Sequence, residues 1–157
     1  MKGRFQWMAA VHIQSSAAHV WEIIDDISLI PQYHLEVNRV DLLTGQQNRA
    51  LGVKYRCNIL GGRKGSCVQE VIEYIPNVKM STGISEDTWG MDKMFSNFIV
   101  ETTVIPKPDR STIFQFEAYY DPAGFRNRIL NTLILRHVMK KRARLTKRGI
   151  KRRSEVR

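Results

Sequence analysis

The chain has 157 residues, of which 43% are hydrophobic and 25% are charged. These values are typical of one globular domain that buries a core without metal or disulfide staples. Two cysteines are too few for a disulfide framework and lack the spacing of zinc ligands. The chain has no signal-peptide core and no stretch near the ~18 apolar residues of a membrane span. We therefore expect a cytoplasmic protein.

The formal net charge of +10 is concentrated at one end of the chain. Residues 1–135 hold 14 Lys and Arg against 14 Asp and Glu, whereas residues 136–157 hold 11 against 1. We divide the chain into a domain, residues 1–145, and a basic C-terminal tail, residues 146–157. Such a run attracts the phosphates of nucleic acid or of anionic lipid, although charge runs are more often simply solvated. The expected anion-binding surface comprises Lys140, Lys141, Arg142, Arg144, Lys147, Arg148, Lys151, Arg152 and Arg153.

The first third of the chain predicts a strand, two short helices and a second strand. Residues 5–13 alternate with a period of two, which indicates a half-buried strand. Ser15 and Ser16 can cap a short helix that ends at the acidic pair Asp25 and Asp26. A second helical piece over residues 27–33 is disturbed by Pro31. A strand is then expected over residues 36–43.

Residues 53–75 predict a hairpin, because two alternating segments flank Gly61 and Gly62. A turn centred on Gly62 sets the register of the two strands. The opposed pairs are then Cys57 with Cys67, Tyr55 with Gln69, Val53 with Val71, and Lys54 with Glu70. Paired strand positions usually lie farther apart than a disulfide tolerates, and the expected compartment is reducing, so we expect two reduced core thiols.

The rest of the chain predicts three strands and one long helix. The strands cover residues 78–85, 94–105 and 112–120, with a polar loop holding an exposed Trp89 between the first two. The helix covers residues 121–147, with Asp121 as its N-cap and Pro122 in its first turn. Apolar spacings of three and four predict one buried stripe on it. The stripe comprises Phe125, Ile129, Leu130, Leu133, Ile134, His137 and Val138.

This order of elements resembles the polyketide cyclase/dehydrase and lipid transport superfamily, the START-like and Bet v 1-like helix-grip proteins. The resemblance covers about residues 5 to 145 and is carried by VWEIIDDISLIPQYHLEVNRVDLLTG, by EVIEYIPN, and by the spacing of Ala18, Val20, Trp21, Ile24, Asp26, Pro31 and Val40. It implies an α+β fold in which a seven-stranded antiparallel sheet wraps around a long C-terminal helix. The resemblance also implies two short helices between strands 1 and 2. Members hold apolar ligands between sheet and helix, and only some are enzymes.

A cavity between the sheet and the helix is the expected ligand site. Strand alternation and helix spacing predict its lining: Tyr55, Gln69, Thr102, Phe114, Phe116, Tyr120, Leu130, Ile134 and His137. For the apolar members, core packing is the more common role. His137 is the sharpest polar candidate, since an imidazole on an apolar helix face can bind a ligand oxygen or hold a structural hydrogen bond. His34 follows the Pro31 bend, as a gate residue or, more often at such a place, a solvated one.

The function that we expect is binding, and by extension transport, of a hydrophobic or amphipathic small molecule. One alternative is a cyclase/dehydrase-like enzyme that pairs Tyr55 or Tyr120 with His137 as base. Another is an interaction protein whose basic C-terminus docks on RNA, ribosome or anionic membrane. No glycine-rich phosphate loop, HExxH or GxSxG is present, so we expect no cofactor and no metal.

Overall fold

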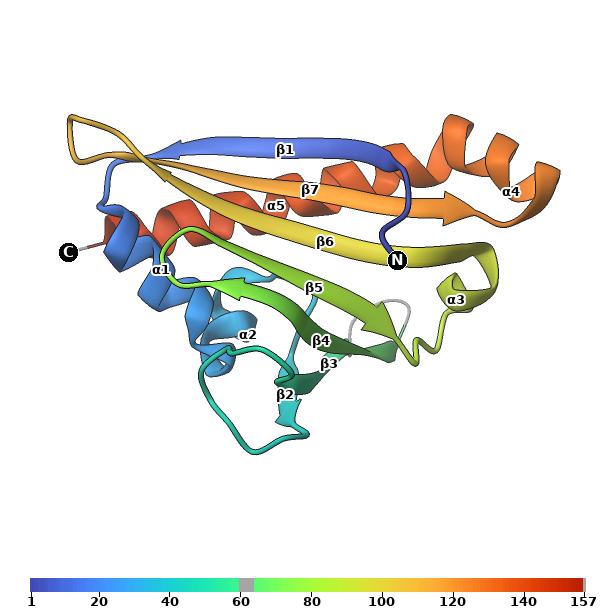
Figure 1. Ribbon diagram of the computed structural model, residues 1–157, viewed down its shortest axis with the longest axis horizontal. Coiled ribbons are helices and arrows are strands. Elements are labelled where there is room, and N and C mark those ends of the chain that lie inside the picture. Colours follow the sequence, from blue (N-terminus) through green and yellow to red (C-terminus); the bar gives the residue numbers. More distant parts are fainter. Residues whose placement is uncertain (60–63, 157) are drawn as a thin grey trace.

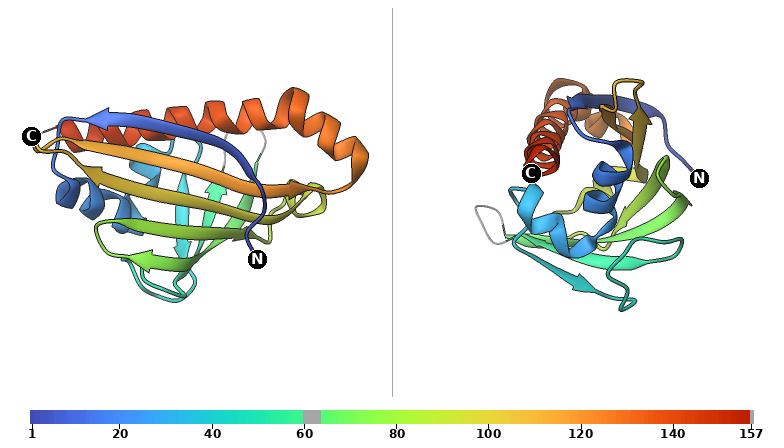
Figure 2. Two further views of the ribbon diagram at one scale, coloured as in Figure 1. Left: turned by 45° about the horizontal axis from the view of Figure 1, so that its top comes forward. Right: turned by 90° about the vertical axis from the view of Figure 1, so that its left-hand side faces the viewer.

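The computed structural model describes residues 1–59 and 64–156. Within them, seven strands form one antiparallel sheet in the order β1-β7-β6-β5-β4-β3-β2, curved around a long C-terminal helix (Figures 1 and 2). The strands are β1 (Phe5–Ile13), β2 (Arg39–Leu42), β3 (Lys54–Ile59), β4 (Gly65–Ile75), β5 (Lys79–Ser85), β6 (Phe95–Pro106) and β7 (Thr112–Pro122). The helical elements are α1 (Ala17–Asp25), the 3-10 turn η1 (Ile27–Leu29), α2 (Ile30–Tyr33), α3 (Met91–Met94), α4 (Gly124–Leu130), the π-helical η2 (Asn131–Leu135) and α5 (Arg136–Glu155). The α+β helix-grip prediction is confirmed.

The connector between β1 and β2 contains the expected short helices, and the expected cap at Ser16 is confirmed. The hydroxyl of Ser16 accepts the backbone N–H of His19 and caps α1. The carboxylate of Asp26 accepts the N–H of Ser28 and caps η1. Pro31 stands in the first turn of α2, where its missing N–H removes no helical bond. Pro31 therefore lies at the start of a helix and does not disturb one, contrary to expectation. The following strand also differs, since β2 spans Arg39–Leu42 and is shorter than the expected residues 36–43.

The register of the β3–β4 hairpin is confirmed. Cys57 lies opposite Cys67, and Tyr55 lies opposite Gln69. Lys54 faces Glu70 and forms an ion pair with it at 3.2 Å. Both cysteines are buried and free. The turn expected at Gly62 lies outside the described residues.

The predicted start of the long helix is wrong. Pro122 still belongs to β7, and the helix begins at Gly124, whose φ of +73° turns the chain out of the sheet. Asp121 does not cap the helix. Its carboxylate instead accepts hydrogen bonds from Arg4 Nε at 3.1 Å and Asn97 Nδ2 at 3.2 Å. Proline suits either a strand end or a first helical turn, so its presence did not distinguish them.

The predicted buried stripe of the helix is also wrong. Most of its members are exposed, including Phe125, Ile129, Leu133, Ile134, His137 and Val138. The helix faces the sheet through Asn131, Leu135 and Met139, which follow each other at intervals of four. The sequence around η2 is apolar almost all round, so periodicity alone could not choose the buried side. The buried side of the helix is set by its contact with the sheet.

The basic C-terminal segment is part of the helix and packs on the body. Residues 146–155 belong to α5, so the expected boundary at residue 145 does not coincide with a structural one. This segment buries Thr146, Gly149, Ile150 and Ser154. A Cβ at Gly149 would lie 2.1 Å from the carbonyl oxygen of Tyr33, which shows how closely α5 approaches α2. The two ends of the helix thus differ, because the C-terminal half packs against the body while the N-terminal half is largely exposed (Figure 1).

The interior consists of two hydrophobic clusters. The main cluster joins α1 and α2 to the sheet and to Ile150 of α5. Trp89, expected to be exposed, is partly buried and packs against this cluster. The smaller cluster comprises Trp7, Phe95, Ala118 and Tyr120, with Phe98, Phe116, Met91, Met94, Leu135, Met139 and Ala143 packed around it. It lies beneath η2 and the first turns of α5, toward the end of the sheet where α3 stands.

Candidate functional site

The inner face of the sheet beneath η2 is rich in aromatic side chains. The rings of Phe98 and Tyr120 stack with centroids 4.8 Å apart and planes 12° apart. Phe95 tilts against Tyr120 at 4.6 Å. A bulge in β6 between Ser96 and Ile99 brings Phe95 and Phe98 to this cluster together. The result is a compact aromatic cluster next to a pocket, with Phe98 and Tyr120 nearly parallel and Phe95 tilted against both.

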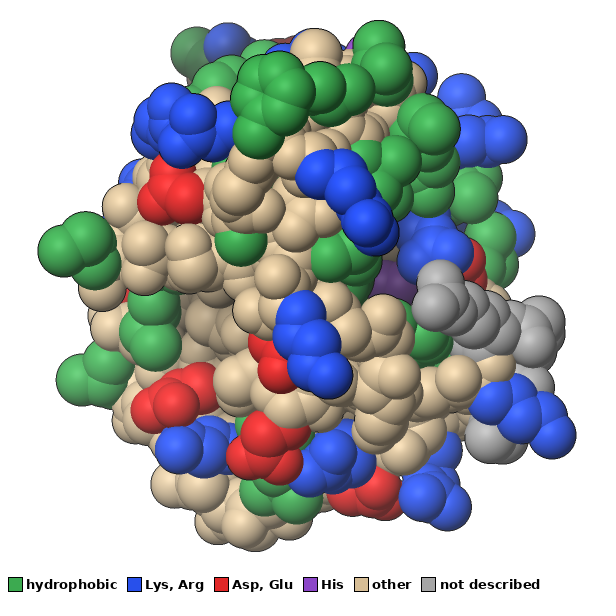
Figure 3. Space-filling model, turned by 90° about the vertical axis from the view of Figure 1, so that its right-hand side faces the viewer, with side chains coloured by type: hydrophobic (Ala, Val, Ile, Leu, Met, Phe, Trp, Pro, Cys, Tyr) green, Lys and Arg blue, Asp and Glu red, His purple; other side chains and the backbone are tan. Residues whose placement is uncertain are grey.

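A pocket of about 260 Å³ opens at this end, beside α3. Figure 3 views the molecule from this side and shows hydrophobic side chains gathered over its upper part, where the helix begins. The pocket has an apolar floor and a polar, largely acidic rim. Its lining residues are Ile84, Ser85, Glu86, Asp87, Met91, Asp92, Phe95, Asn97 and Phe98.

A short hydrogen-bond chain fixes the helix to the sheet at the smaller cluster. The Tyr120 hydroxyl donates to Asn131 Oδ1 at 2.8 Å, and Asn131 Nδ2 donates to Gln6 Oε1 at 3.1 Å. Gln6 Nε2 in turn donates to the backbone oxygen of Tyr120 at 2.7 Å. Burial raises the pKa of Tyr120, so the phenol stays protonated and keeps its donor role. The Tyr120 hydroxyl, which we expected to bond a ligand, therefore already donates its hydrogen bond to Asn131.

Two buried side-chain nitrogen atoms have no hydrogen-bond partner in the described protein, Trp7 Nε1 and His34 Nδ1. The Trp7 N–H lies near the Tyr120 side chain and the His34 ring near its own backbone, so each nitrogen has a protein group close by but no hydrogen bond of good geometry. Burial lowers the pKa of His34, with Glu36 opposing that shift and Arg142 adding to it. The ring is thus neutral at pH 7. His34 is not the solvated loop residue that its sequence position favoured.

Tyr55 and Gln69 lie within the main cluster, in a polar network that sequence reasoning missed. Arg49 is buried and donates to the Tyr55 hydroxyl from Nε at 3.2 Å and from Nη2 at 2.9 Å. The Tyr55 hydroxyl donates to Gln69 Oε1 at 2.8 Å. Burial raises the pKa of Tyr55 to about 12, although Arg49 opposes the shift. A loop arginine carries no sequence signal that distinguishes it from a solvated one.

The other predicted lining residues fall into separate places. Thr102 and Phe116 are opposed across β6 and β7, as alternation predicted. Phe114 is fully buried in the main cluster. Leu130 is partly buried, whereas Ile134 and His137 are exposed. The nine predicted residues therefore do not surround one common space, and their ligand roles stay predictions.

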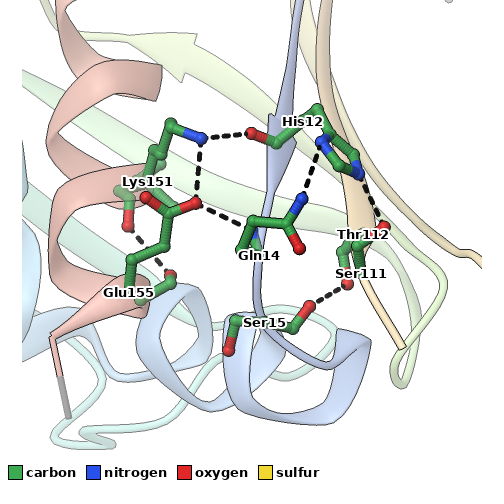
Figure 4. Close-up of polar contacts among 9 residues, drawn as sticks. His12, Gln14, Ser15, Ser111, Thr112, Lys151 and Glu155 are labelled. Carbon is green, nitrogen blue, oxygen red and sulfur yellow. Dashed lines mark hydrogen bonds and ion pairs between the residues drawn. The ribbon is translucent and has the colours of Figure 1, made fainter. Parts of the chain in front are cut away.

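Catalytic pairing of Tyr55 or Tyr120 with His137 is not assembled, because His137 is exposed while both tyrosines are buried. The structure instead brings His12 Nε2 within 2.6 Å of Ser111 Oγ (Figure 4). Ser111 Oγ donates to Asp109 Oδ1 at 2.5 Å, so it must accept a hydrogen bond from His12. A histidine that donates to a serine cannot be the base that activates it.

The same region ties the end of the helix to the end of β1 (Figure 4). Lys151 Nζ donates to the His12 carbonyl at 2.7 Å and pairs with Glu155 at 2.8 Å. Glu155 Oε1 accepts the backbone N–H of Gln14 at 2.8 Å. Lys147 also donates to the carbonyl of Ala10, on the open edge of β1. Two of the nine cations in the expected anion-binding surface are therefore bonded to the protein backbone.

Neither a metal centre nor a membrane span is found in residues 1–59 and 64–156. No three His, Cys, Asp or Glu side chains gather there into a group that could hold a metal ion. No helix in this part of the chain is both long and apolar enough to cross a membrane.

A sheet that grips one long helix, with an aromatic inner face opening at one end, defines the helix-grip class of protein. Residues 5–155 match the family described as polyketide cyclase / dehydrase and lipid transport. The match extends over nearly the whole chain, and the protein belongs to this family. The comparison with curated proteins gives no match.

Several solved structures share the fold. Major latex-like protein 151 from Panax ginseng has a TM-score of 0.77 at 12% identity, over 96% of this chain and 97% of that one. A START superfamily protein from Mycobacterium smegmatis has a TM-score of 0.70 at 16% identity, over 96% and 97%. A point mutant of Thalictrum flavum norcoclaurine synthase, in complex with a transition-state analogue, has a TM-score of 0.68 at 12% identity, over 94% and 95%. At these identities the likeness shows the fold alone, and family and fold together suggest ligand binding.

Proposed function

We propose that the protein binds a hydrophobic or amphipathic small molecule in the pocket beside α3, between the end of β5 and the start of β6. The observation that carries this proposal is the aromatic surface of Phe95 and Phe98 at the floor of an open pocket of about 260 Å³. Concave, mostly apolar sites with a few polar groups are the usual form of small-molecule sites in proteins. This volume lies just below the common range of about 300–1,000 Å³, which favours a compact ligand or the compact end of a longer one.

The chemistry of binding follows from the residues near the site. Removing an apolar ligand surface from water contributes about 25 cal/mol per Å², so contact with Ile84, Phe95 and Phe98 supplies most of the affinity. Ser85 and Asn97, the uncharged polar residues of the pocket lining, can supply orientation by bonding a polar group of the ligand. Acidic residues at the pocket rim disfavour an anionic group there.

A fluorescence titration with bis-anilinonaphthalene tests the site, since this apolar dye brightens on leaving water. Ile84→Trp fills the pocket, and we expect it to weaken dye binding by at least ~10-fold, because steric filling removes the contact area. Ile72→Trp is the matched control. Ile72 lies on β4 and is exposed, outside the pocket lining. Equal dye affinity in both variants, with thermal unfolding unchanged, would place the site elsewhere.

Native mass spectrometry then identifies the natural ligand class. Protein from its own source should carry a small-molecule mass that denaturation releases, and Ile84→Trp should lose that mass. The enzyme alternative required Tyr55 or Tyr120 beside His137, and this pair is not assembled, so we do not propose it. Docking on RNA or ribosome and a cytoplasmic location stay predictions.

A further inference from the structure

The exposed side of the helix carries an apolar surface that the described part of the chain does not cover. We call this the outer helix surface and define it as Phe125, Ile129, Leu133, Ile134 and Val138. Phe125 is 78% exposed and Leu133 is 68% exposed. Isolated exposed apolar residues are ordinary, but five on adjacent turns of one helix form a contiguous patch, which commonly marks an interaction site. Figure 3 shows hydrophobic side chains gathered at this end of the molecule.

The outer helix surface is also concave. A shallow concavity of about 440 Å³ runs along it, with aliphatic walls and one cation at its edge. It is lined by Arg126, Ile129, Leu130, Leu133 and Ile134. The surface therefore lies on the opposite side of the helix from Asn131 and Leu135, which face the sheet.

The charge around the outer helix surface is entirely positive along the helix. Residues 122–154 contain no Asp or Glu. Five cations lie within or next to the apolar segment: Arg126, Arg128, Arg136, Lys140 and Lys141. In the described residues, no carboxylate lies within 4.0 Å of any of these five. An occupant of this surface must therefore be apolar and anionic at once.

Three kinds of occupant can be compared on that requirement. A second copy across a twofold axis would bring the same arginines face to face, which is unfavourable. RNA would match the charge but would leave aliphatic side chains such as Leu133 in water, and Phe125 is the one aromatic ring of the surface available for base stacking. An anionic bilayer takes both kinds of group, because apolar side chains enter the acyl boundary while cations remain among head groups.

We propose that the outer helix surface docks the protein on an anionic lipid bilayer, with the helix lying in the plane of the interface. Phe125, Ile129 and Leu133 enter the lipid, and Arg126 and Lys141 contact head-group phosphates and carboxylates. This surface is separate from the ligand pocket beside α3. Docking is therefore a second property of the helix, and it does not depend on the proposed ligand.

Vesicle co-sedimentation of the full chain tests the proposal. The vesicles contain phosphatidylcholine with about one-third phosphatidylserine, or phosphatidylcholine alone, at low and at high salt. We expect binding to the anionic vesicles to exceed binding to the neutral ones by at least ~10-fold and to fall with salt, as for basic interfacial helices. The double variant Phe125→Ser with Leu133→Ser should bind the anionic vesicles at least ~10-fold more weakly than the unmodified protein does. Arg126→Gln with Lys141→Gln should weaken binding to the anionic vesicles alone.

The matched control is Leu43→Ser with Leu51→Ser, which removes two exposed leucines outside the helix. All variants change exposed residues, and circular dichroism confirms that each one folds. If the Phe125 and Leu133 variant binds anionic vesicles as the control does, the outer helix surface is not the docking site. If the unmodified protein ignores vesicles and forms a dimer that this variant abolishes in sedimentation velocity, the occupant is a second copy and the lipid proposal is wrong.

Discussion

Replacing Gly149 by alanine should destabilise the protein, although the same change stabilises most helices. Alanine is favoured over glycine in a helix interior by about 1 kcal/mol. At this position the new Cβ would lie 2.1 Å from the Tyr33 carbonyl oxygen and 2.9 Å from its carbonyl carbon. Contacts shorter than about 3 Å are not tolerated, so α5 and α2 must separate by about 1 Å.

The separation would loosen the packing around Ile150, which is 1% exposed in the main cluster. Overpacking of this kind costs about 1–3 kcal/mol, and lost contacts at Ile150 add about 1 kcal/mol. After subtracting the helix-propensity gain, we expect a net loss of about 2 kcal/mol in the free energy of unfolding.

Urea unfolding followed by circular dichroism measures this loss from the transition midpoint at constant m-value. Arg148→Ala is the matched control, because Arg148 is exposed on the same turn and its replacement should change stability by less than about 0.5 kcal/mol. A Gly149→Ala protein that gains about 1 kcal/mol would refute the reasoning, because it would show the basic C-terminal segment to be a helix free of the body.

Two further predictions concern titratable groups. Burial raises the pKa of Cys57 to about 12 and of Cys67 to about 11, so both thiols stay protonated at neutral pH. Iodoacetamide should therefore alkylate the native protein at least ~100-fold more slowly than the urea-unfolded chain. Comparable rates in the two states would show that the thiols are accessible. Asp87 accepts the backbone N–H groups of Trp89, Met91 and Asp92, and such bonds hold its pKa below the ordinary value despite an opposing effect of burial. Asp87→Ala should therefore cost about 1 kcal/mol near pH 7, and because the folded-state pKa is depressed, this difference should shrink as the pH falls below about 4. A difference that is independent of pH would contradict the role of the carboxylate charge.

Several parts of the fold could be predicted because their signals are local. The period of two in residues 53–59 and 67–75, with a Gly-Gly turn between them, was enough to set the pairing of Cys57 with Cys67. The cap at Ser16 was recognisable because it involves the helix immediately after it. These features depend on neighbours within about 20 residues along the chain, so a single sequence contains the information needed to find them.

The candidate site could not be predicted as well, because its residues depend on distant contacts. Tyr120 and Phe116 were placed on the inner face by strand alternation, and the structure agrees. Nothing in the sequence indicated that Asn131 would accept a hydrogen bond from the Tyr120 hydroxyl, or that Arg49 would be buried in the core. The unpartnered nitrogen of His34 depends on the packing of α2 beside the long helix, which no local pattern encodes.

The sequence by itself determined the order of the seven strands, the hairpin register and the concentration of charge at the C-terminal end. Only the tertiary structure decided how the long helix is rotated about its axis. Residues 129–135 are apolar on almost every side, so several rotations bury similar areas in isolation. The curved sheet selects the one that places Asn131 and Leu135 inward, because β1 and β7 meet that side of the helix. The same rotation leaves Phe125 and Leu133 in contact with water.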